Sequence, residues 1–397
     1  MMKKRYLTAV IAALMCSPHA LAQIEFNGFG SVRASYSDSD EGAPPLTYLD
    51  EGEVTFKGES LFALQARGEL GEGLSATIQL FAEGRDDFDV EARWAYLSYQ
   101  INDIHQVHIG KLANPIFHQS EYEKVGYAHN FSRLPTAVYS DFEFSTMEGI
   151  SLNSQFSLAD GDYTLDTKLS FGNWDGALFL SAVGGEVPLA FDQIISLNLT
   201  LSSDWWKVFA GIFGAEIQAE QFDQTVVLAS VQPGIDLALA QGATANDVNN
   251  FINGLGWHEK DGLYWFSGFG IDYNNILLDA EYVSYGVDES SDSTNEGWYV
   301  ALGYRFNEFV ITVHAEEQTQ EIDYSEGLSG VQSPILLATG QTFIEVLGQP
   351  EFDAVGITLR YDFHPNAAFK VDYISGDHTR LDIGDYSIMS AGIDVVF

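Results

Sequence analysis

The last twelve residues of the chain, YSIMSAGIDVVF (386–397), alternate between two kinds of side chain up to the final residue. One parity carries Met389, Ala391, Ile393, Val395 and Phe397, and the other includes Ser390, Gly392 and Asp394. Alternation with period two is typical of a β-strand with one apolar and one polar face. Soluble domains usually add a polar, frayed tail after their last element. We therefore expect this strand to be paired with another along its whole length, including at Phe397.

Period-two alternation covers most of the remaining sequence, as in SLFALQARGEL (60–70). Sixteen such segments lie at about 24–37, 53–70, 73–86, 89–101, 105–112, 146–158, 162–172, 191–203, 204–217, 263–273, 275–287, 296–306, 308–321, 351–363, 366–376 and 385–397. Most are longer than the usual globular strand of about five or six residues and match the roughly nine to eleven residues of a tilted membrane strand. Their length and even number predict an all-β, transmembrane, antiparallel 16-stranded β-barrel.

The connections between these segments alternate between short turns and long loops. The long loops cover about 37–50, 113–145, 218–262 and 322–350. Short periplasmic turns and long extracellular loops are typical of outer-membrane barrels. In a closed barrel the last strand pairs with the first, which starts at Ile24, so that no edge is exposed to lipid. Within two of the loops, segments 225–255 and 334–349 have helix-compatible spacing, and we expect the first to be broken at Pro233–Gly234.

The N-terminal segment, residues 1–22, has the features of an export signal. Three bases at positions 3–5 precede a nine-residue apolar run, Leu7–Met15, and a small-residue cleavage site, Ala20–Ala22. A run of this length is too short to span a bilayer as a helix, so we expect it to be cleaved. A lipoprotein anchor at Cys16 is the alternative, although Met15 occupies a position where a small residue is expected. The mature chain, 23–397, is then one barrel domain without cysteine.

Charge restricts the partners of the chain. The sequence holds 18 Lys+Arg and 57 Asp+Glu, a formal net charge of −39. Without the three bases of the leader, 15 basic and 57 acidic residues give −42. Such a chain repels phosphate, which excludes nucleic acid as a natural partner. A hydrophobic content of 46% and an aromatic content of 13% exclude a disordered acidic chain.

Several motifs occur in an order that resembles one known family. The opening FNGFGSV (26–32), the hairpin GELGEGLSATIQL (68–80), the strand RWAYL (93–97) and the segment HQVHIGK (105–111) precede the terminal Phe397. Together they resemble the general diffusion porins of Gram-negative bacteria in their sixteen-stranded trimeric form. Phe397 resembles the C-terminal assembly signal of outer-membrane proteins, with Val395 where tyrosine is usual. The resemblance implies a homotrimer in contact with outer-membrane lipid and lipopolysaccharide, assembled by the barrel-assembly machinery through its C-terminal strand.

The resemblance also implies that the third loop, about 113–145, folds into the barrel and narrows it. The acidic candidates on this loop are Glu121, Glu123, Asp141 and Glu143. The basic candidates on the facing wall are Arg33, Arg67, Arg85, Arg93 and Lys111. The first four have the polar parity of their strands, and Lys111 looks like a basic residue of the family at the base of the loop. Leu61 stands where the family has a wall arginine.

The polar parity of the later strands is predominantly acidic. The candidate lumen acids are Asp279, Glu281, Glu316 and Asp372. Rings of charge set ion selectivity in channels, so we expect a pore with a weak preference for cations. Acidic loops could also bridge to lipopolysaccharide through divalent cations, although none of them has the spacing of an EF-hand. The alternative is that these acids interact only with water and bind no cation.

Three other functions are weighed against a diffusion channel. A substrate-selective channel for sugars or small acids could use the same barrel. A barrel hydrolase is disfavoured because HExxH and GxSxG motifs are absent and no cysteine follows the leader. A secreted soluble β-sandwich or adhesin is disfavoured by the strand count and the terminal phenylalanine. We therefore expect no enzyme, no cofactor and no metal site.

Overall fold

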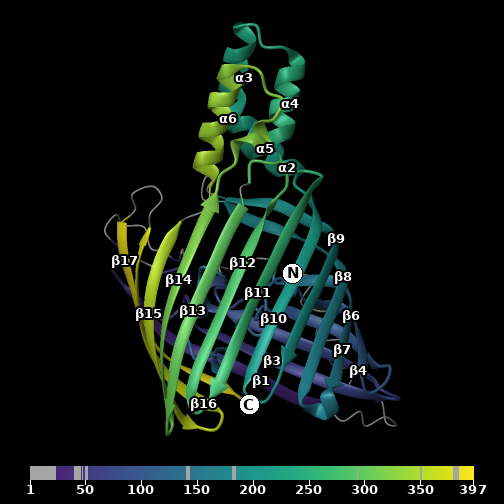
Figure 1. Ribbon diagram of the computed structural model, residues 1–397, viewed down its shortest axis with the longest axis vertical. Coiled ribbons are helices and arrows are strands. Elements are labelled where there is room, and N and C mark those ends of the chain that lie inside the picture. Colours follow the sequence, from purple (N-terminus) through teal and green to yellow (C-terminus); the bar gives the residue numbers. More distant parts are fainter. Residues whose placement is uncertain are drawn as a thin grey trace, which may run out of the picture.

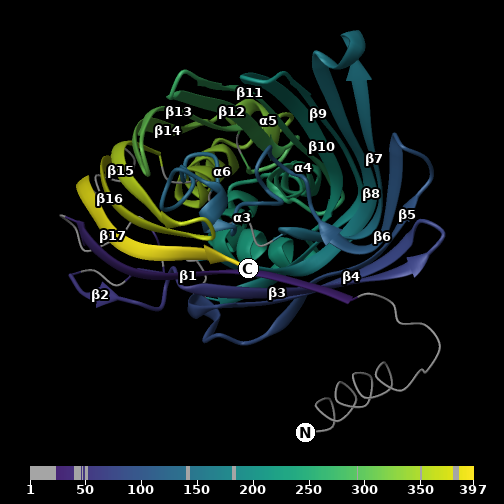
Figure 2. The same ribbon diagram turned by 90° about the horizontal axis from the view of Figure 1, so that it is seen from below.

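The computed structural model describes residues 24–39, 46, 48–49, 52–139, 144–180, 185–292, 294–348, 351–378 and 384–397. The predicted leader, residues 1–22, lies outside these ranges. The described strands form one antiparallel sheet that closes into a barrel (Figures 1 and 2). The sheet has seventeen strands, of which β2 has two residues, so sixteen long strands form the wall. This architecture confirms the predicted fold.

The strands follow one another around the barrel in chain order. Their bounds are β1 Ile24–Ser39, β2 Val54–Thr55, β3 Leu61–Gly71, β4 Leu74–Glu83, β5 Glu91–Gln100, β6 His105–Ala113, β7 Thr146–Leu158, β8 Tyr163–Leu180, β9 Gly185–Ser202, β10 Trp206–Gln218, β11 Lys260–Tyr273, β12 Ile276–Val287, β13 Thr294–Phe306, β14 Phe309–Glu321, β15 Phe352–His364, β16 Ala367–His378 and β17 Gly384–Val396. Short turns join them at one rim, and the longer loops emerge at the other. We call these the turn rim and the loop rim.

The barrel closes where β17 pairs with β1, in an unbroken register of eleven residue pairs. Gly28 N donates to Phe397 O at 2.8 Å, and Phe397 N donates to Gly28 O at 3.0 Å. The Phe397 ring is 53% exposed on the outer face and stacks on Phe62 at a centroid distance of 6.0 Å. The expected pairing of the last strand up to its terminal residue is therefore confirmed.

The predicted strands differ from the observed ones at two places. The expected strand 53–70 is divided, because the chain leaves the sheet between β2 and β3 and Ser60 Oγ bonds back to Phe56 O at 2.6 Å. Strands β8 and β9 extend well beyond the expected 162–172 and 191–203. A register shift between Gly172 and Trp174 interrupts the simple alternation there, which explains why these longer strands were missed.

The inner face of the barrel has two sectors of different chemistry. On β8–β13 the inward side chains are mainly aromatic and pack into the main hydrophobic core, which we call the apolar sector. Its buried wall aromatics are Trp174, Phe191, Phe209, Phe213, Tyr264, Phe266, Tyr285 and Tyr299. On β1–β5 and β14–β17 the inward side chains are mainly polar or charged, and we call this the charged sector. The two faces of the strands in the apolar sector are therefore both largely apolar.

Two inserted loops form a helical cap above the loop rim (Figure 1). Its helices are α2 Glu220–Phe222, the π-helix η4 Asp223–Leu228, α3 Ala229–Ala240, α4 Ala245–Leu255, α5 Tyr324–Leu328 and α6 Pro334–Leu347. Three single 3-10 turns lie elsewhere, at η1 Gly84–Asp86, η2 Gly126–Ala128 and η3 Ala159–Gly161. In the described part of the chain, no helix has both the length and the apolar character needed to cross a membrane.

Helix α3 continues through Pro233 and Gly234, so the expected break at this dipeptide is wrong. A Cβ at Gly234 would lie 2.3 Å from Thr339 Oγ1 of α6, which shows that the glycine permits close packing of α3 on α6. Phe251 and Leu336 are fully buried between the helices. The Asp247 carboxylate accepts from Gln332 N at 2.6 Å and thereby joins the two inserts.

We expect Gly28→Ala to weaken barrel closure. The added Cβ would lie 2.4 Å from the Phe397 ring and 2.6 Å from Ala63 O, so ring and backbone must move. Overpacking of this kind costs about 1–3 kcal/mol. The measurement is the temperature at which the refolded barrel loses its compact mobility in detergent electrophoresis. Gly68→Ala is the control, because nothing lies within 4 Å of its added Cβ. Equal temperatures for both variants would contradict the packing argument.

Candidate functional site

A long loop between β6 and β7 folds into the barrel, where it lies across the bore (Figure 2). We call residues 114–145 the constriction loop, of which 140–143 lie outside the described residues. One side of the loop packs its apolar side chains, including Phe117, Phe131 and Tyr139, into the apolar sector. The loop therefore fills one side of the barrel and leaves the space beside the charged sector.

Two of the predicted lumen acids hold this loop by accepting hydrogen bonds from it. Glu281 of β12 accepts from His118 N at 3.1 Å and from the Tyr139 hydroxyl at 2.5 Å. Glu316 of β14 accepts from Ala137 N at 2.8 Å. Both carboxylates are 2% exposed. They lie on the inner face, as period two predicts, but the structure places them against the loop backbone.

Two wall bases hold the loop by donating to its carbonyl oxygens. Arg360 Nη1 donates to Tyr127 O at 2.9 Å and to His129 O at 2.8 Å. Lys370 Nζ donates to Gly126 O at 2.6 Å and lies 2.8 Å from Asp394 Oδ2. Both bases lie on the inner face of their strands, and the pattern of a single strand does not show which wall position meets the loop.

Arg133 of the constriction loop forms a buried ion-pair cluster that sequence analysis missed. Its guanidinium donates to Glu59 through two parallel bonds of 2.6 and 2.7 Å and to Asp372 at 3.1 Å. The side chains of Glu59 and Arg133 are 6% and 8% exposed. Asp372, predicted as a lumen acid, thus faces a base of the loop. The available signal was that Arg133 is the single arginine in the predicted loop, 113–145.

The ionisation of Glu59 is set by this cluster. Burial raises the pKa of the Glu59 carboxyl, but the charge of Arg133 and the hydrogen bonds from its guanidinium outweigh burial. The net result lowers the pKa of Glu59 to about 2. Glu59 therefore remains charged across the ordinary pH range and holds Arg133 at the wall.

Four of the five predicted basic wall residues lie on the inner face, and Lys111 does not. Arg33 is 5% exposed and lies 3.2 Å from Asp394, whereas Arg93 is 6% exposed and its guanidinium stacks over the Phe81 ring at 4.6 Å. Arg67 bonds Glu69 at 2.9 Å and is 41% exposed. Arg85 bonds Glu83 at 2.8 Å.

Lys111 has the parity of Ile109, which is 55% exposed on the outer face of β6. Its register partners are Ala95 and Glu148, and the next pair, Leu112 with Met147, is buried on the inner side. Because side chains alternate along a strand, Lys111 faces outward. Its expected place in the basic wall is wrong, since the motif resemblance was followed where strand parity indicated the other face.

Of the four acidic candidates on the loop, the structure describes two, Glu121 and Glu123. Glu121 is paired with Lys168 of β8. Glu123 lies 3.2 Å from Lys124 Nζ, which in turn lies 3.9 Å from the wall residue Glu83. Asp141 and Glu143 lie outside the described residues.

The fourth predicted lumen acid, Asp279 of β12, lies at the turn-rim side of the loop. It accepts from the Tyr299 hydroxyl at 3.1 Å, and Lys207 Nζ lies 4.0 Å from its carboxylate. Neither of these partners belongs to the constriction loop. Asp279 is therefore the lumen acid with the most solvent access, at 28% exposure of its side chain.

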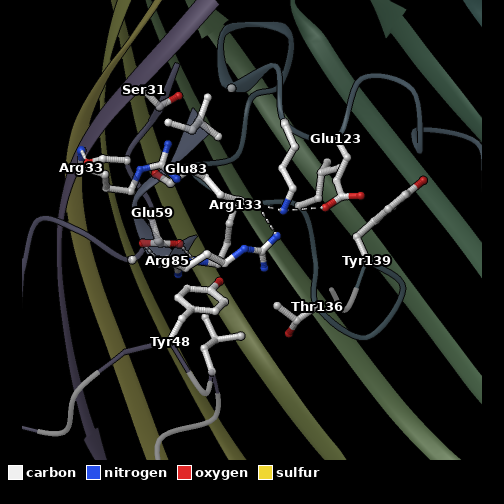
Figure 3. A pocket seen from close by; sticks show the side chains of 18 of the residues that line it. Ser31, Arg33, Tyr48, Glu59, Glu83, Arg85, Glu123, Arg133, Thr136 and Tyr139 are labelled. Carbon is white, nitrogen blue, oxygen red and sulfur yellow. Dashed lines mark hydrogen bonds and ion pairs between the residues drawn. The ribbon is translucent and has the colours of Figure 1, made fainter. Parts of the chain in front are cut away.

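Cavities lie on both sides of the constriction loop. One, on the loop-rim side, has a volume of about 400 Å³ and is lined by charged residues that include Arg33, Glu59, Glu83 and Glu123 (Figure 3). We call it the upper chamber. A second cavity of about 390 Å³ lies at the turn rim and is lined in part by Lys207. His129 lines both, so segment 126–131 of the loop forms the partition between them.

We expect Glu59→Gln to destabilise the barrel near neutral pH, because it leaves the buried Arg133 without its main countercharge. Breaking a buried ion pair costs about 3–5 kcal/mol. The pKa of Glu59 is lowered from 4.5 to about 2. The pair therefore contributes fully above about pH 4.5, and its contribution is lost as the pH falls through about 2.

The measurement is the urea midpoint of the refolded protein, followed by tryptophan fluorescence at pH 7 and at roughly pH 2. The difference between wild type and Glu59→Gln should be large at pH 7 and should shrink towards zero in acid. Glu69→Gln, in an exposed pair with Arg67, is the control and should change little at either pH. A difference that does not depend on pH would refute the role given to the Glu59 charge.

The chain matches the family model described as Gram-negative porin over residues 7–384. No curated protein matches it. Among solved structures it is similar to an anion-selective porin from Comamonas acidovorans, at 10% identity and a TM-score of 0.57, covering 94% of this chain and 99% of that one.

Two further structures show the same likeness. The outer membrane channel DcaP of Acinetobacter baumannii is 13% identical with a TM-score of 0.55, covering 96% of this chain and 100% of that one. OmpT of Vibrio cholerae, in a trimer form, is 11% identical with a TM-score of 0.52, covering 94% and 99%. At these identities the likeness shows the barrel fold. The family match spans nearly the whole sequence, so the chain belongs to the Gram-negative porin family and forms a channel of the outer membrane.

Proposed function

We propose that this porin is a water-filled channel for passive diffusion of small hydrophilic solutes and ions, with a weak preference for cations. The observation that carries the proposal is the pair of chambers on either side of the constriction loop, each bordered by charged side chains. A lumen of this kind keeps polar solutes hydrated while they cross the apolar membrane. The loop narrows the passage and thereby limits solute size.

The preference for cations is supported by the composition of the helical cap. Segments 218–258 and 322–350 contain no lysine or arginine. Glu220, Asp236 and Glu345 of the cap are exposed. Net negative charge at a channel mouth attracts cations and repels anions over a Debye length of about 8 Å at physiological salt. The preference is weak because most charges nearer the constriction are paired with opposite charges.

The proposal extends to assembly and surroundings. A homotrimer is supported by the structurally similar Vibrio cholerae protein, which is described in a trimer form. Contact with lipopolysaccharide and recognition of Phe397 by the barrel-assembly machinery are part of the same proposal. A passive channel, rather than an enzyme, agrees with the family and with the use of the buried carboxylates to hold the constriction loop.

The direct test is single-channel recording of the refolded protein in a planar bilayer. We expect ohmic current steps that occur in groups of three in KCl. A reversal potential under a KCl gradient should show a modest preference for potassium. Anion preference would refute the proposed selectivity, and the absence of current steps would refute the diffusion channel.

We expect removal of the cap charges to reduce the cation preference. The variant Glu220→Gln/Asp236→Asn/Glu345→Gln removes three exposed acids above the mouth. Asp175→Asn/Glu186→Gln is the control, because these exposed residues lie on the outward parity of the β8–β9 hairpin. The cap variant should shift the reversal potential towards zero, and the effect should diminish at high salt. An equal shift in the control would show that the cap has no special part in selectivity.

A further inference from the structure

The helical cap has an open groove between α3 and α6, two helices that lie side by side above the loop rim (Figure 1). The groove has a volume of about 500 Å³. Val226, Ser230 and Val231 of η4 and α3 line one side, and residues between Ala338 and Leu347 of α6 line the other. Exposed apolar patches on a protein surface mark sites of interaction, so this groove is a candidate docking surface.

The α6 side of the groove offers apolar contact rather than hydrogen bonds. Thr339 and Thr342 both line it, and each hydroxyl is already used within the helix. Thr339 Oγ1 donates to Ile335 O at 2.8 Å, and Thr342 Oγ1 donates to Ala338 O at 3.0 Å. A partner that covers this side therefore gains mainly from the removal of apolar surface from water.

Two exposed apolar side chains set the length of the groove. Val346, on the α6 side, is 67% exposed, and Leu237 of α3 is 51% exposed. Leu237 follows Ser230 by seven residues, about two helical turns, so it continues the groove along the same side of α3. Residues 338–347 of α6 extend over roughly 14 Å, whereas apolar anchors at positions i, i+4 and i+7 of a bound helix extend over roughly 10 Å. The groove is therefore long enough for the apolar face of one amphipathic helix.

The charge of the cap indicates which kind of helix fits the groove. Segments 218–258 and 322–350 contain seven acidic residues and no lysine or arginine. Glu345 is exposed and lies seven residues after Ala338, on the same side of α6, so it lies beside the groove. Two caps of this charge repel each other, and the same charge repels the phosphate groups of lipopolysaccharide. A basic partner is therefore favoured over a second copy of the chain and over lipid.

We propose that the groove between α3 and α6 is a docking site for a cationic amphipathic helix. The apolar residues of this helix enter the groove, and its lysine or arginine side chains face Glu345 and the other acids of the cap. Apolar contact provides most of the affinity, and opposite charge speeds the encounter and fixes the orientation. The inference goes beyond the proposed channel and does not depend on it, because the groove lies on the cap and not in the lumen.

The test compares three labelled synthetic peptides of equal length. The first arranges leucine and lysine as an amphipathic helix, the second has the same residues in scrambled order, and the third has glutamate in place of lysine. Binding to the refolded porin in nonionic detergent is measured by fluorescence anisotropy. We expect the first peptide to have a dissociation constant at least about tenfold lower than either of the others, since one lacks a continuous apolar face and the other is repelled by the cap. Added salt should weaken its binding.

Variants at exposed positions of the cap then locate the binding. Ser230→Trp fills the groove and should weaken binding of the leucine–lysine peptide at least about tenfold. Leu239→Trp is the matched control, because Leu239 is 47% exposed and lies nine residues after Ser230, on the opposite side of α3. Val346→Ser should weaken binding several-fold, with Leu239→Ser as its control. Glu345→Gln should weaken binding and reduce its dependence on salt.

Three results would overturn the docking site. The first is equal binding of the leucine–lysine peptide and its scrambled form. The second is binding that Ser230→Trp and Val346→Ser both leave unchanged, because the peptide would then bind elsewhere on the porin. The third is a concentration-dependent increase in the mass of the wild-type porin that Ser230→Trp abolishes, because the groove would then hold a second copy of the chain. Current steps in KCl test the channel separately, so failure of one proposal leaves the other standing.

Discussion

Lipid offers no hydrogen-bonding partners to the protein backbone, and the rest of the structure depends on this constraint. Every strand that crosses the membrane must pair on both edges, because an unpaired N–H or C=O costs several kcal/mol there. The pairing of β17 with β1 meets this requirement, up to the reciprocal bonds between Gly28 and Phe397. The strands run up and down in chain order, so the connections alternate between the two rims, and the long insertions lie at the loop rim. The constriction loop and the helical cap therefore lie where solutes enter.

A closed ring of sixteen strands encloses more space than its own inward side chains can fill. In the apolar sector this space is occupied by the aromatic side chains of β8–β13 together with the constriction loop and the base of the cap. Beside the charged sector it remains open as the upper chamber, whereas the second cavity, at the turn rim, is lined mainly by residues of β9–β13. The division explains how one barrel combines a rigid core with an aqueous passage.

The strands could be predicted from the sequence because contact with lipid requires an apolar side chain at every second position of a strand. The same rule failed at the inner face of β8–β13, where the interior is packed with protein. Strand β10 shows the missed signal, since Phe209 and Phe213 face inward while Val208 and Ile212 face outward, so both parities are apolar. Apolar residues at both parities are typical of a strand that is buried on both faces.

The constriction was less predictable than the barrel. Parity agrees with the inner-face positions of Arg33 and Arg67, whereas Arg93 reaches the inner face at a register shift of β4 against β5 and Arg85 lies in the turn η1. The bonds between Arg133 and Glu59 join residues 74 positions apart, and nothing in local sequence pairs them. The resemblance implied acids on the loop and bases on the wall; Glu123 lies on the loop beside Lys124, and Arg33 lies on the wall beside Asp394. The polarity is reversed at Arg133, where the loop provides the base and the wall provides Asp372.

The charges inside the barrel divide into those that hold the loop and those that face solutes. Glu281, Glu316, Arg360 and Lys370 bond the loop backbone, and Arg133 pairs with buried carboxylates. Buried ion pairs are costly to separate, so these contacts fix the loop in one position. A fixed loop keeps Glu123 at a constant distance from the arginines of β1 and η1. Charges placed in this way need little reorganisation when a polar solute arrives.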